Sequence, residues 1–236
     1  MSKKVLVVPD IHTNHTKAQR IIDFVGADKV VFLGDYFDTF HDNPSQNFNT
    51  AIWVGERIKE HPEDEFLIGN HDMQYVWNME YCSGYTTEKH AAVQSTGLVP
   101  LFREKLKLFT IADGAMISHA GLTQPLAPYK FTYNWLIHEC AEAFENFKQG
   151  ETHWTVKPGV DRGGYAQYGG LTWCDWNSFK LIPSITQICG HTKSYLPRMY
   201  KDNYCIDTAL LHYAVIQNSK VSIHCFHDEI MKGLKS

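Results

Sequence analysis

The sequence lacks most features that mark a secreted, membrane or nucleic-acid-binding protein. Its six cysteines form no CxxC pair and no cysteine-rich framework, which disfavours a zinc ribbon or a disulfide scaffold and predicts free thiols. No apolar stretch approaches membrane-spanning length, and the N-terminus has neither the length nor the cleavage site of a signal peptide. These absences predict a cytoplasmic protein with no membrane partner.

The chain also has no large excess of positive or negative charge. The chain has 22 Lys and Arg against 26 Asp and Glu, a net charge of −4, and no Lys/Arg cluster. This balance disfavours long nucleic acid as a partner, although bound divalent cations can still attract an anionic substrate. The sequence shows no repeat, low-complexity tract or linker. With 44% hydrophobic residues it can bury a sizeable core, so we expect one domain over residues 1–236.

Apolar runs alternate with helical spacing in the first half of the chain, which predicts βαβ units. Polar residues follow each run, at Asp10, Asp35 and Asn70, and the carboxyl edge of such a sheet is where sites form. The predicted elements are strands at 5–8, 30–33 and 66–68 and helices at 16–25 and 47–59.

The second half of the chain predicts another sheet. Asp113-Gly114 lies between the apolar runs 106–112 and 115–118 and is a strong hairpin signal. Further strands are expected at 185–189, 204–207 and 214–226, the last bent at Asn218-Ser219, with a helix at 134–148 and a glycine-rich loop at 159–170. Together these elements suggest two packed sheets with helices outside.

Five short segments carry metal-ligating residue types, each after an apolar strand. They are Asp10-Ile11-His12, Gly34-Asp35-Tyr36-Phe37-Asp38, Gly69-Asn70-His71-Asp72, Ser118-His119-Ala120-Gly121 and Gly190-His191-Thr192. Each alone is a weak signal, but the ordered set is specific. Carboxylates and imidazoles in such a set suit two divalent cations about 4 Å apart, which can clamp a phosphate and a hydroxide.

The spacing suggests how these ligands divide between two ions. Asp10 and His12 lie two residues apart at a strand end, so both side chains are expected to face the same way and bind one ion. Glycines before Asp35, Asn70 and His191 permit close backbone approach. The remaining predicted ligands are Asp35, as the bridge between the ions, and Asn70, His119 and His191 for the second ion.

Other residues are candidates for catalysis and substrate binding. His71 is expected to point away from the ions if the local chain stays extended, so it suits a general acid, with Asp38 to orient its imidazolium. Arg162 can grip a phosphate with its planar fork, and Asn70 is also a candidate substrate contact. A solvated loop arginine is an equally open reading of Arg162, and Arg198 is a weaker candidate for the same role.

The order D-x-H, GD-x-x-D, GNH[DE], H, GH resembles the calcineurin-like metallophosphoesterases over residues 10–192. The details GNHD, SHAGL and GHT, followed by Tyr204-Cys205-Ile206-Asp207-Thr208, look most like the branch containing serine/threonine protein phosphatases and bacterial diadenosine tetraphosphatases. The resemblance implies an α/β fold, a four-layer αββα sandwich of two mixed sheets flanked by helices. It also implies the ligand roles above, Asp38 and His71 as the acid dyad, and two divalent ions, manganese first, with iron, zinc or nickel as alternatives.

The sequence departs from that branch at four positions. Pro9 and Thr13 stand where glycines usually flank the D-x-H triplet, Thr39 replaces an arginine that grips the substrate phosphate, and Ala209 replaces a glycine. The metal site is therefore expected, whereas the substrate does not follow by analogy.

The hypothesis is a metal-dependent phosphoesterase in which a metal-bridging hydroxide attacks a phosphomonoester or phosphodiester and His71 protonates the leaving group. A nucleotide or dinucleotide polyphosphate ranks close to a phosphoprotein as substrate, although Thr39 weakens the phosphoprotein reading. Four aromatic residues could stack a nucleobase, although plain packing is favoured for them: Trp173, Trp176, Tyr165 and Tyr168. The alternative is a metal-binding interaction scaffold that has lost catalysis.

Overall fold

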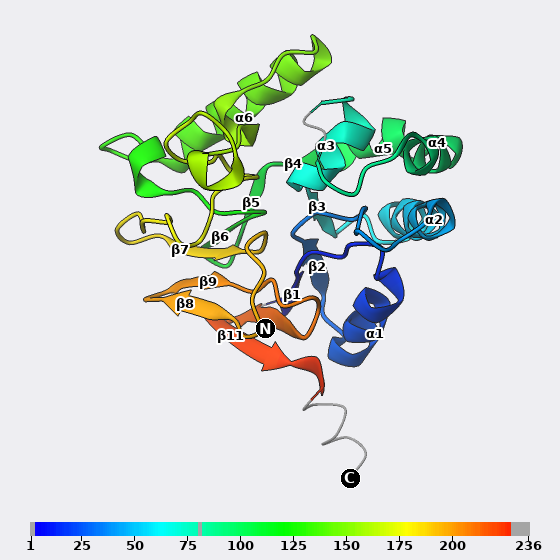
Figure 1. The fold of residues 1–236 in the computed structure, drawn as a ribbon. Coiled ribbons are helices and arrows are strands. Elements are labelled where there is room, and N and C mark those ends of the chain that lie inside the picture. The colour runs from blue at the N-terminus through cyan, green and yellow to red at the C-terminus, as the bar shows by residue number, and fades with distance from the viewer. Residues whose placement is uncertain (1–2, 80–81, 228–236) are drawn as a thin grey trace, which may run out of the picture.

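The computed structural model describes residues 3–79 and 82–227, whose strands form two mixed sheets (Figure 1). The strands of the first sheet are β1 (Val5–Val8), β2 (Lys29–Phe32), β3 (Glu65–Leu67), β4 (Leu106–Lys107), β10 (His212–Gln217) and β11 (Lys220–Cys225). Those of the second are β5 (Phe109–Ala112), β6 (Ala115–Ser118), β7 (Thr186–Cys189), β8 (Arg198–Tyr200) and β9 (Asn203–Cys205). Their orders are β11-β10-β1-β2-β3-β4 and β5-β6-β7-β9-β8.

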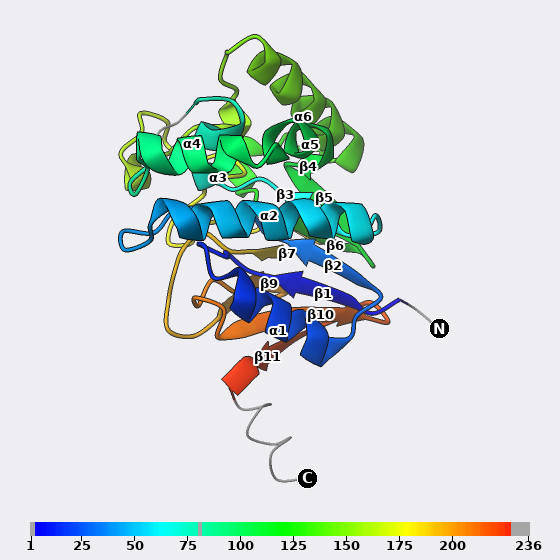
Figure 2. The ribbon, with the colours of Figure 1, turned by 90° about the vertical axis from the view of Figure 1, so that its right-hand side faces the viewer.

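Helices cover the outer faces of both sheets. They are α1 (His15–Val25), α2 (Pro44–Glu60), α3 (Asn70–Val76), α4 (Thr87–Ser95), α5 (Leu98–Lys105) and α6 (Tyr133–Lys148). Short 3₁₀ turns occur at Gln124–Leu126, Trp154–Val156 and Val160–Arg162. Figure 2 shows α1 and α2 lying across the first sheet, with α4 above α2, and Figure 1 shows α6 on the side of the second. The predicted αββα sandwich of two mixed sheets is confirmed.

The side chains of β1 alternate between the two faces of the sheet, so this one strand contributes to two apolar clusters. Successive side chains of a strand point to opposite faces. Val7 belongs to the apolar cluster that includes Ile117 and Ile188 of the second sheet, whereas Leu6 belongs to the cluster that includes Ile21 of α1. Because both faces of the strand are covered, its residues read as one continuous apolar run.

Two turns in the second half contain residues with a left-handed backbone. Asp113 (φ 47°) and Gly114 (φ 88°) close the predicted hairpin between β5 and β6. Asn218 (φ 53°) and Ser219 (φ 56°) do the same between β10 and β11. Positive φ at both central residues is the geometry that reverses a strand. The prediction of one bent strand over 214–226 is therefore wrong, because the chain turns back there.

Other boundaries also differ from the prediction. The apolar run 106–112 is divided between the sheets, because Leu106–Lys107 pairs with β3 and Phe109–Ala112 pairs with β6. Helix α2 begins at Pro44, three residues earlier than expected, because Asn43 and Gln46 form a reciprocal capping box. The six cysteines are free thiols. No helix within 3–79 or 82–227 combines the length and apolar character needed to cross a membrane.

Candidate metal centre and active site

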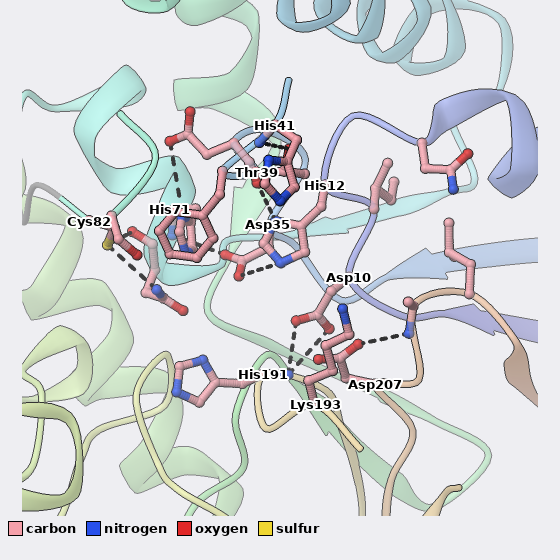
Figure 3. A pocket seen from close by; sticks show the side chains of 18 of the residues that line it. Asp10, His12, Asp35, Thr39, His41, His71, Cys82, His191, Lys193 and Asp207 are labelled. Atoms are coloured by element: carbon pink, nitrogen blue, oxygen red, sulfur yellow. Dashed lines mark hydrogen bonds and ion pairs between the residues drawn. The ribbon is translucent and has the colours of Figure 1, made fainter. Parts of the chain in front are cut away.

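The predicted ligands converge where the carboxyl ends of strands from both sheets meet (Figure 3). Asp10 and Asp35 follow β1 and β2, and Asn70 is the first residue of α3, which follows β3. His119 and His191 follow β6 and β7 of the second sheet. Residues more than 180 positions apart in the sequence thus share one site.

Two groups of ligand atoms share the carboxylate of Asp35. The groups are Asp10, His12 and Asp35, and Asp35, His119 and His191, and the ligand atoms within each lie within 4.8 Å of one another. Nε2 of His12 and Nε2 of His119 each lie 3.6 Å from Oδ2 of Asp35. Oδ1 of Asn70 lies 3.0 Å from Nε2 of His119. The carboxylate of Asp35 is therefore common to both groups.

The backbone carries Asp10 and His12 into the site by a turn, so the prediction that both lie on a strand end is wrong. Strand β1 ends at Val8, and His12 has a left-handed backbone with φ of 44°. The amides of Ile11 and His12 both donate to the carbonyl of Asp35, at 3.1 and 2.8 Å. This turn, and not strand alternation, brings the two side chains to the same ligand group.

Backbone carbonyls orient two of the imidazoles. Nδ1 of His12 lies 2.6 Å from the carbonyl of Asp38, and Nδ1 of His119 lies 2.9 Å from the carbonyl of Leu33. A carbonyl only accepts, so in each ring Nδ1 carries the proton and Nε2 presents its lone pair to the site. Such a partner on the far nitrogen is the usual support of a metal-ligating histidine.

This arrangement of lone pairs fits a cation. Nε2 of His119 faces Oδ1 of Asn70 at 3.0 Å, Nδ1 of His191 at 3.3 Å and Oδ2 of Asp35 at 3.6 Å. The lone pair of His119 Nε2 thus lies against the oxygens of Asn70 and Asp35, and a divalent cation can bind all three atoms. Nε2 of His191 is buried and makes no hydrogen bond to the described part of the chain. Hence the donor set suits the divalent ions that the sequence predicts.

The carboxylates show the same need for positive charge. Burial raises the pKa of Asp10, and the charges of Asp207 and Asp35 raise it further. Burial also acts to raise the pKa of Asp35, but the surrounding histidines, His119 first, outweigh it and lower that pKa. A cation between these groups would offset both the burial and the charge repulsion that raise the pKa of Asp10.

Two glycines make room for the ligand carboxylates, as predicted. A Cβ on Gly69 would collide with Oδ1 of Asp35, and a Cβ on Gly190 would collide with Oδ1 of Asp10. In place of a side chain, the next amide approaches the carboxylate, since the His191 N–H donates to Oδ2 of Asp10 at 3.0 Å.

Asp72 organises the site without being a predicted ligand. It is fully buried, and its carboxylate accepts from the amides of Gly69 and Asp35, both at 2.8 Å, and of Tyr36 at 2.9 Å. It thereby joins the turn after β2 to the start of α3. We assigned it no role from the sequence, although an acidic residue three positions after a glycine is a signal for a helix start.

The predicted acid dyad lies on the wall of the site. Nδ1 of His71 is 3.8 Å from Oδ2 of Asp38. This separation is that of an ion pair and is too long for a hydrogen bond. The Asp38 carboxylate is fully buried and accepts from the Tyr75 hydroxyl at 2.5 Å and from the Gln74 amide. Burial acts to lower the pKa of His71, but the charges of Asp35 and Asp38 outweigh it and raise that pKa.

The expected local conformation of His71 is wrong. Asn70 and His71 are the first residues of α3, so the chain is helical there and not extended. The helix starts at this point because Gly69 precedes it and Asp72 binds the Gly69 amide. Successive residues in the first turn point in different directions, so His71 still points away from Asn70.

A pocket of about 630 Å³ opens over the site, and Arg162 is part of its wall. Nε of Arg162 lies 2.8 Å from Oδ2 of Asp175, and its Nη2 donates to the Thr192 hydroxyl at 3.4 Å. Arg198 is not among the pocket residues, and its guanidinium binds the Thr192 carbonyl instead. Of the four aromatic candidates, only Trp173 lines the pocket.

Several pocket residues escaped the sequence reasoning. They are Asn14, Phe40, His41, Cys82, Ser83, Lys193 and Leu210. Lys193 comes directly after the Gly190-His191-Thr192 segment. Its position two residues after the predicted ligand His191 could have indicated that it lies in the site. Phe40 gave no signal, because an exposed aromatic cannot be recognised without its neighbours.

The fold and the ligand groups define a class: an αββα sandwich that holds divalent metals where its sheets meet. The calcineurin-like phosphoesterase family matches residues 3–195. The chain therefore belongs to this family and is a metal-dependent hydrolase of phosphate esters. The comparison with curated proteins gives no match.

Solved structures share the fold at low sequence identity. A cold-active protein-tyrosine phosphatase of a psychrophile Shewanella sp. is 13% identical with a TM-score of 0.61, covering 94% of this chain and 78% of that one. A protein serine/threonine phosphatase from Saccharomyces cerevisiae is 14% identical with a TM-score of 0.56, covering 95% and 79%. A putative diadenosine tetraphosphatase is 16% identical with a TM-score of 0.49, covering 94% and 93%.

Proposed function

We propose that this chain hydrolyses phosphate esters at a dinuclear metal site in which Asp35 bridges the ions and His71 is the general acid. The observation that carries the proposal is the pair of ligand groups sharing Asp35, with the His71–Asp38 pair on the wall of the same pocket. The proposed ligands are Asp10, His12 and Asp35 for one ion and Asp35, Asn70, His119 and His191 for the other.

Bound divalent ions supply positive charge for the phosphoryl oxygens and an activated water as nucleophile. The rest of the chemistry falls to side chains of the chain. Water adds to phosphorus as the ester bond breaks, and the departing oxygen takes the proton from the imidazolium of His71. Asp38 stabilises that imidazolium before transfer. The products are phosphate and an alcohol, and His71 recovers its proton from solvent.

Two cations in the pocket wall support phosphate binding. Arg162 is held by Asp175, which fixes its planar fork, and Lys193 lies in the same pocket. Related phosphatases have an arginine at the position of Thr39. We propose that Arg162 and Lys193 bind the phosphate in its place. Arg binds phosphate oxygens in pairs, whereas Lys acts as a point charge. We therefore propose Arg162 as the main phosphate contact, with Asn70 beside it.

The substrate is proposed from the size and charge of the pocket. A volume of about 630 Å³ exceeds what one phosphate needs, so an organic group is expected to enter with it. The fold is shared with phosphatases that act on proteins, by their names. We propose a small nucleotide, a dinucleotide polyphosphate or a phosphoprotein, in that order.

Turnover of an aryl phosphate, an alkyl phosphate and a panel of nucleotides, with added manganese and then with a chelator, tests the proposal. We expect hydrolysis that manganese supports and the chelator abolishes. His119→Ala serves as a matched variant and should lose bound metal, measured by elemental analysis, together with all activity. Hydrolysis that survives the chelator, or a His119→Ala protein with full metal content, would contradict the proposed site.

A further inference from the structure

The alcohol part of the substrate must lie on the side from which its proton arrives. In the proposed function His71 protonates the leaving oxygen, so the leaving group extends toward the wall that contains His71. Figure 3 shows His71 on the same side of the site as Thr39 and His41, with Lys193 and Asp207 on the opposite side. The residues of this wall are therefore the ones that can select the leaving group.

Two short loops form this wall, and one residue in them stands out. Thr39, Phe40 and His41 come from the loop after β2, and Cys82 and Ser83 come from the loop after α3. Phe40 lines the pocket while 79% of its surface is exposed. A large aromatic side chain that is mostly exposed and lines a catalytic pocket is available to a ligand.

The exposure of Phe40 is imposed by an ordered turn. The Thr39 hydroxyl accepts from the amides of His41 and Asp42, at 3.1 and 2.9 Å. In return the Thr39 amide donates to Oδ1 of Asp42 at 2.9 Å. These three hydrogen bonds close a turn around Phe40 and restrain the backbone on both sides of it, while its side chain stays largely exposed.

A buried ammonium ties this turn to the second loop. Lys89 of α4 is only 5% exposed, and its Nζ donates to Asp42 at 2.5 Å, to the Gly84 carbonyl at 2.6 Å and to the Thr39 carbonyl at 3.1 Å. Burying a lysine is costly unless it is paired and fully hydrogen-bonded, as it is here. The wall that presents Phe40 is thus held rigidly, which limits the entropy lost when a ligand binds.

We propose that Phe40 selects substrates whose leaving group carries a planar aromatic ring, which stacks on the exposed face of Phe40. The proposal rests on the proposed function and deepens it by naming the chemistry of the leaving group. Both an aryl group of a phosphorylated side chain and a nucleobase present such a ring. An offset stack of two rings contributes attraction beyond the apolar area that it buries. This contribution is lost when either ring is removed.

Two matched substrate pairs test this inference. Benzyl phosphate and cyclohexylmethyl phosphate both release a primary alkoxide and differ in the aromaticity of the ring. Adenosine 5′-monophosphate and ribose 5-phosphate also release a primary alkoxide and differ in the presence of the nucleobase. In the unmodified enzyme we expect kcat/KM to favour the aromatic member of at least one pair by about 2- to 10-fold. Phe40→Ala should bring that ratio close to one, mainly through KM, and Phe40→Tyr should retain it.

The pair that responds identifies the source of the ring. A response of the benzyl pair indicates a phosphate ester with an aryl group close to the ester oxygen, and a response of the adenosine pair indicates a nucleotide. Tyr129→Ala is the matched control, because Tyr129 is fully exposed outside the pocket, and it should change neither ratio. Equal ratios in the unmodified enzyme and Phe40→Ala overturn this inference alone. Absence of metal-dependent hydrolysis of all four compounds overturns the proposed function and this inference with it.

Discussion

At the scale of single residues, His71 is the group whose contribution depends on the leaving group. An alkoxide needs a proton as it departs, whereas nitrophenolate does not. We therefore expect His71→Asn to slow hydrolysis of an alkyl phosphate by roughly 10²–10⁴-fold and that of nitrophenyl phosphate far less. Steady-state rates on both substrates measure the difference. Metal content should equal that of the unmodified protein, because His71 is not a proposed ligand.

His191→Ala provides the contrast to this variant. Its imidazole belongs to a ligand group, so the substitution should lower metal occupancy and damage both substrates alike. If His71→Asn loses a metal ion, or slows both substrates equally, the assignment of the acid is wrong.

Arg162 makes a second prediction at this scale. Its guanidinium lines the pocket and is positioned by Asp175 at 2.8 Å. Arg162→Gln removes the charged fork, so we expect KM for a phosphomonoester to rise about tenfold or more, because charge-assisted hydrogen bonds are the strong ones. Arg20→Gln, on the outer surface of α1, serves as the control and should leave KM unchanged. An unaltered KM in Arg162→Gln would reduce Arg162 to a structural partner of Asp175.

At the scale of elements, α3 determines the direction of two functional side chains. It starts at Asn70, directly after a glycine, and its third residue is Asp72, whose carboxylate binds three backbone amides. Both carboxylate oxygens are used as acceptors. An asparagine at this position would place an amide N–H₂ against a backbone N–H and leave buried donors without a partner.

Asp72→Asn is therefore expected to lower the free energy of unfolding by roughly 2–3 kcal/mol. Because α3 positions Asn70, the variant should also bind metal more weakly. Chemical denaturation and elemental analysis measure the two effects. Asp23→Asn is the matched control, since Asp23 is exposed on α1 and accepts from the Gln19 amide in an exposed hydrogen bond. Normal stability and metal content in Asp72→Asn would show that the carboxylate charge has no part in holding α3.

Local patterns predicted some elements well and could not predict others. The strands β1 and β2 are covered on both faces, so their continuous apolar runs were visible in the sequence. Helix α4 has no apolar stripe to detect, because its buried residues are Lys89 and Val93. Lys89 is buried because its ammonium donates hydrogen bonds to the carbonyls of two loops. A local sequence pattern does not reveal such bonds, since the loops come together only in the fold.

At the scale of the whole molecule, the site depends on how the two sheets meet. The ligand types could be predicted from five short segments, because metal chemistry restricts the choice of residue. The positive φ of His12 could not be predicted, nor could the assignment of Leu106–Lys107 to the first sheet. Each is decided by partners in other strands. The pocket wall was missed for the same reason, since Phe40 and Lys193 acquire a role only when the loops come together.

The first sheet also contains an ion-pair cluster that links three strands far from the pocket. Glu65 of β3 lies between Lys29 of β2, at 2.5 Å, and Lys107 of β4, at 2.8 Å. Burial acts to raise the pKa of Glu65, but the hydrogen bonds from Lys107 and Lys29 outweigh it and lower that pKa below its usual 4.5. A carboxylate with a depressed pKa stabilises the fold above its usual pKa, and this contribution is lost as the pH falls through the lower, folded value.

Glu65→Gln should therefore lower the free energy of unfolding by about 1 kcal/mol at pH 7, a modest amount because Lys107 is half exposed and solvent screens the pair. The difference from the unmodified protein should shrink as the pH falls from 4.5 through the lower, folded pKa, below which Glu65 is uncharged in both states. Denaturation curves at pH 7 and at decreasing pH measure this convergence. Glu145→Gln is the matched control, because its pair with Lys148 is exposed on α6 and should contribute almost nothing. A loss that stays constant with pH would mean that Glu65 acts by packing and not by charge.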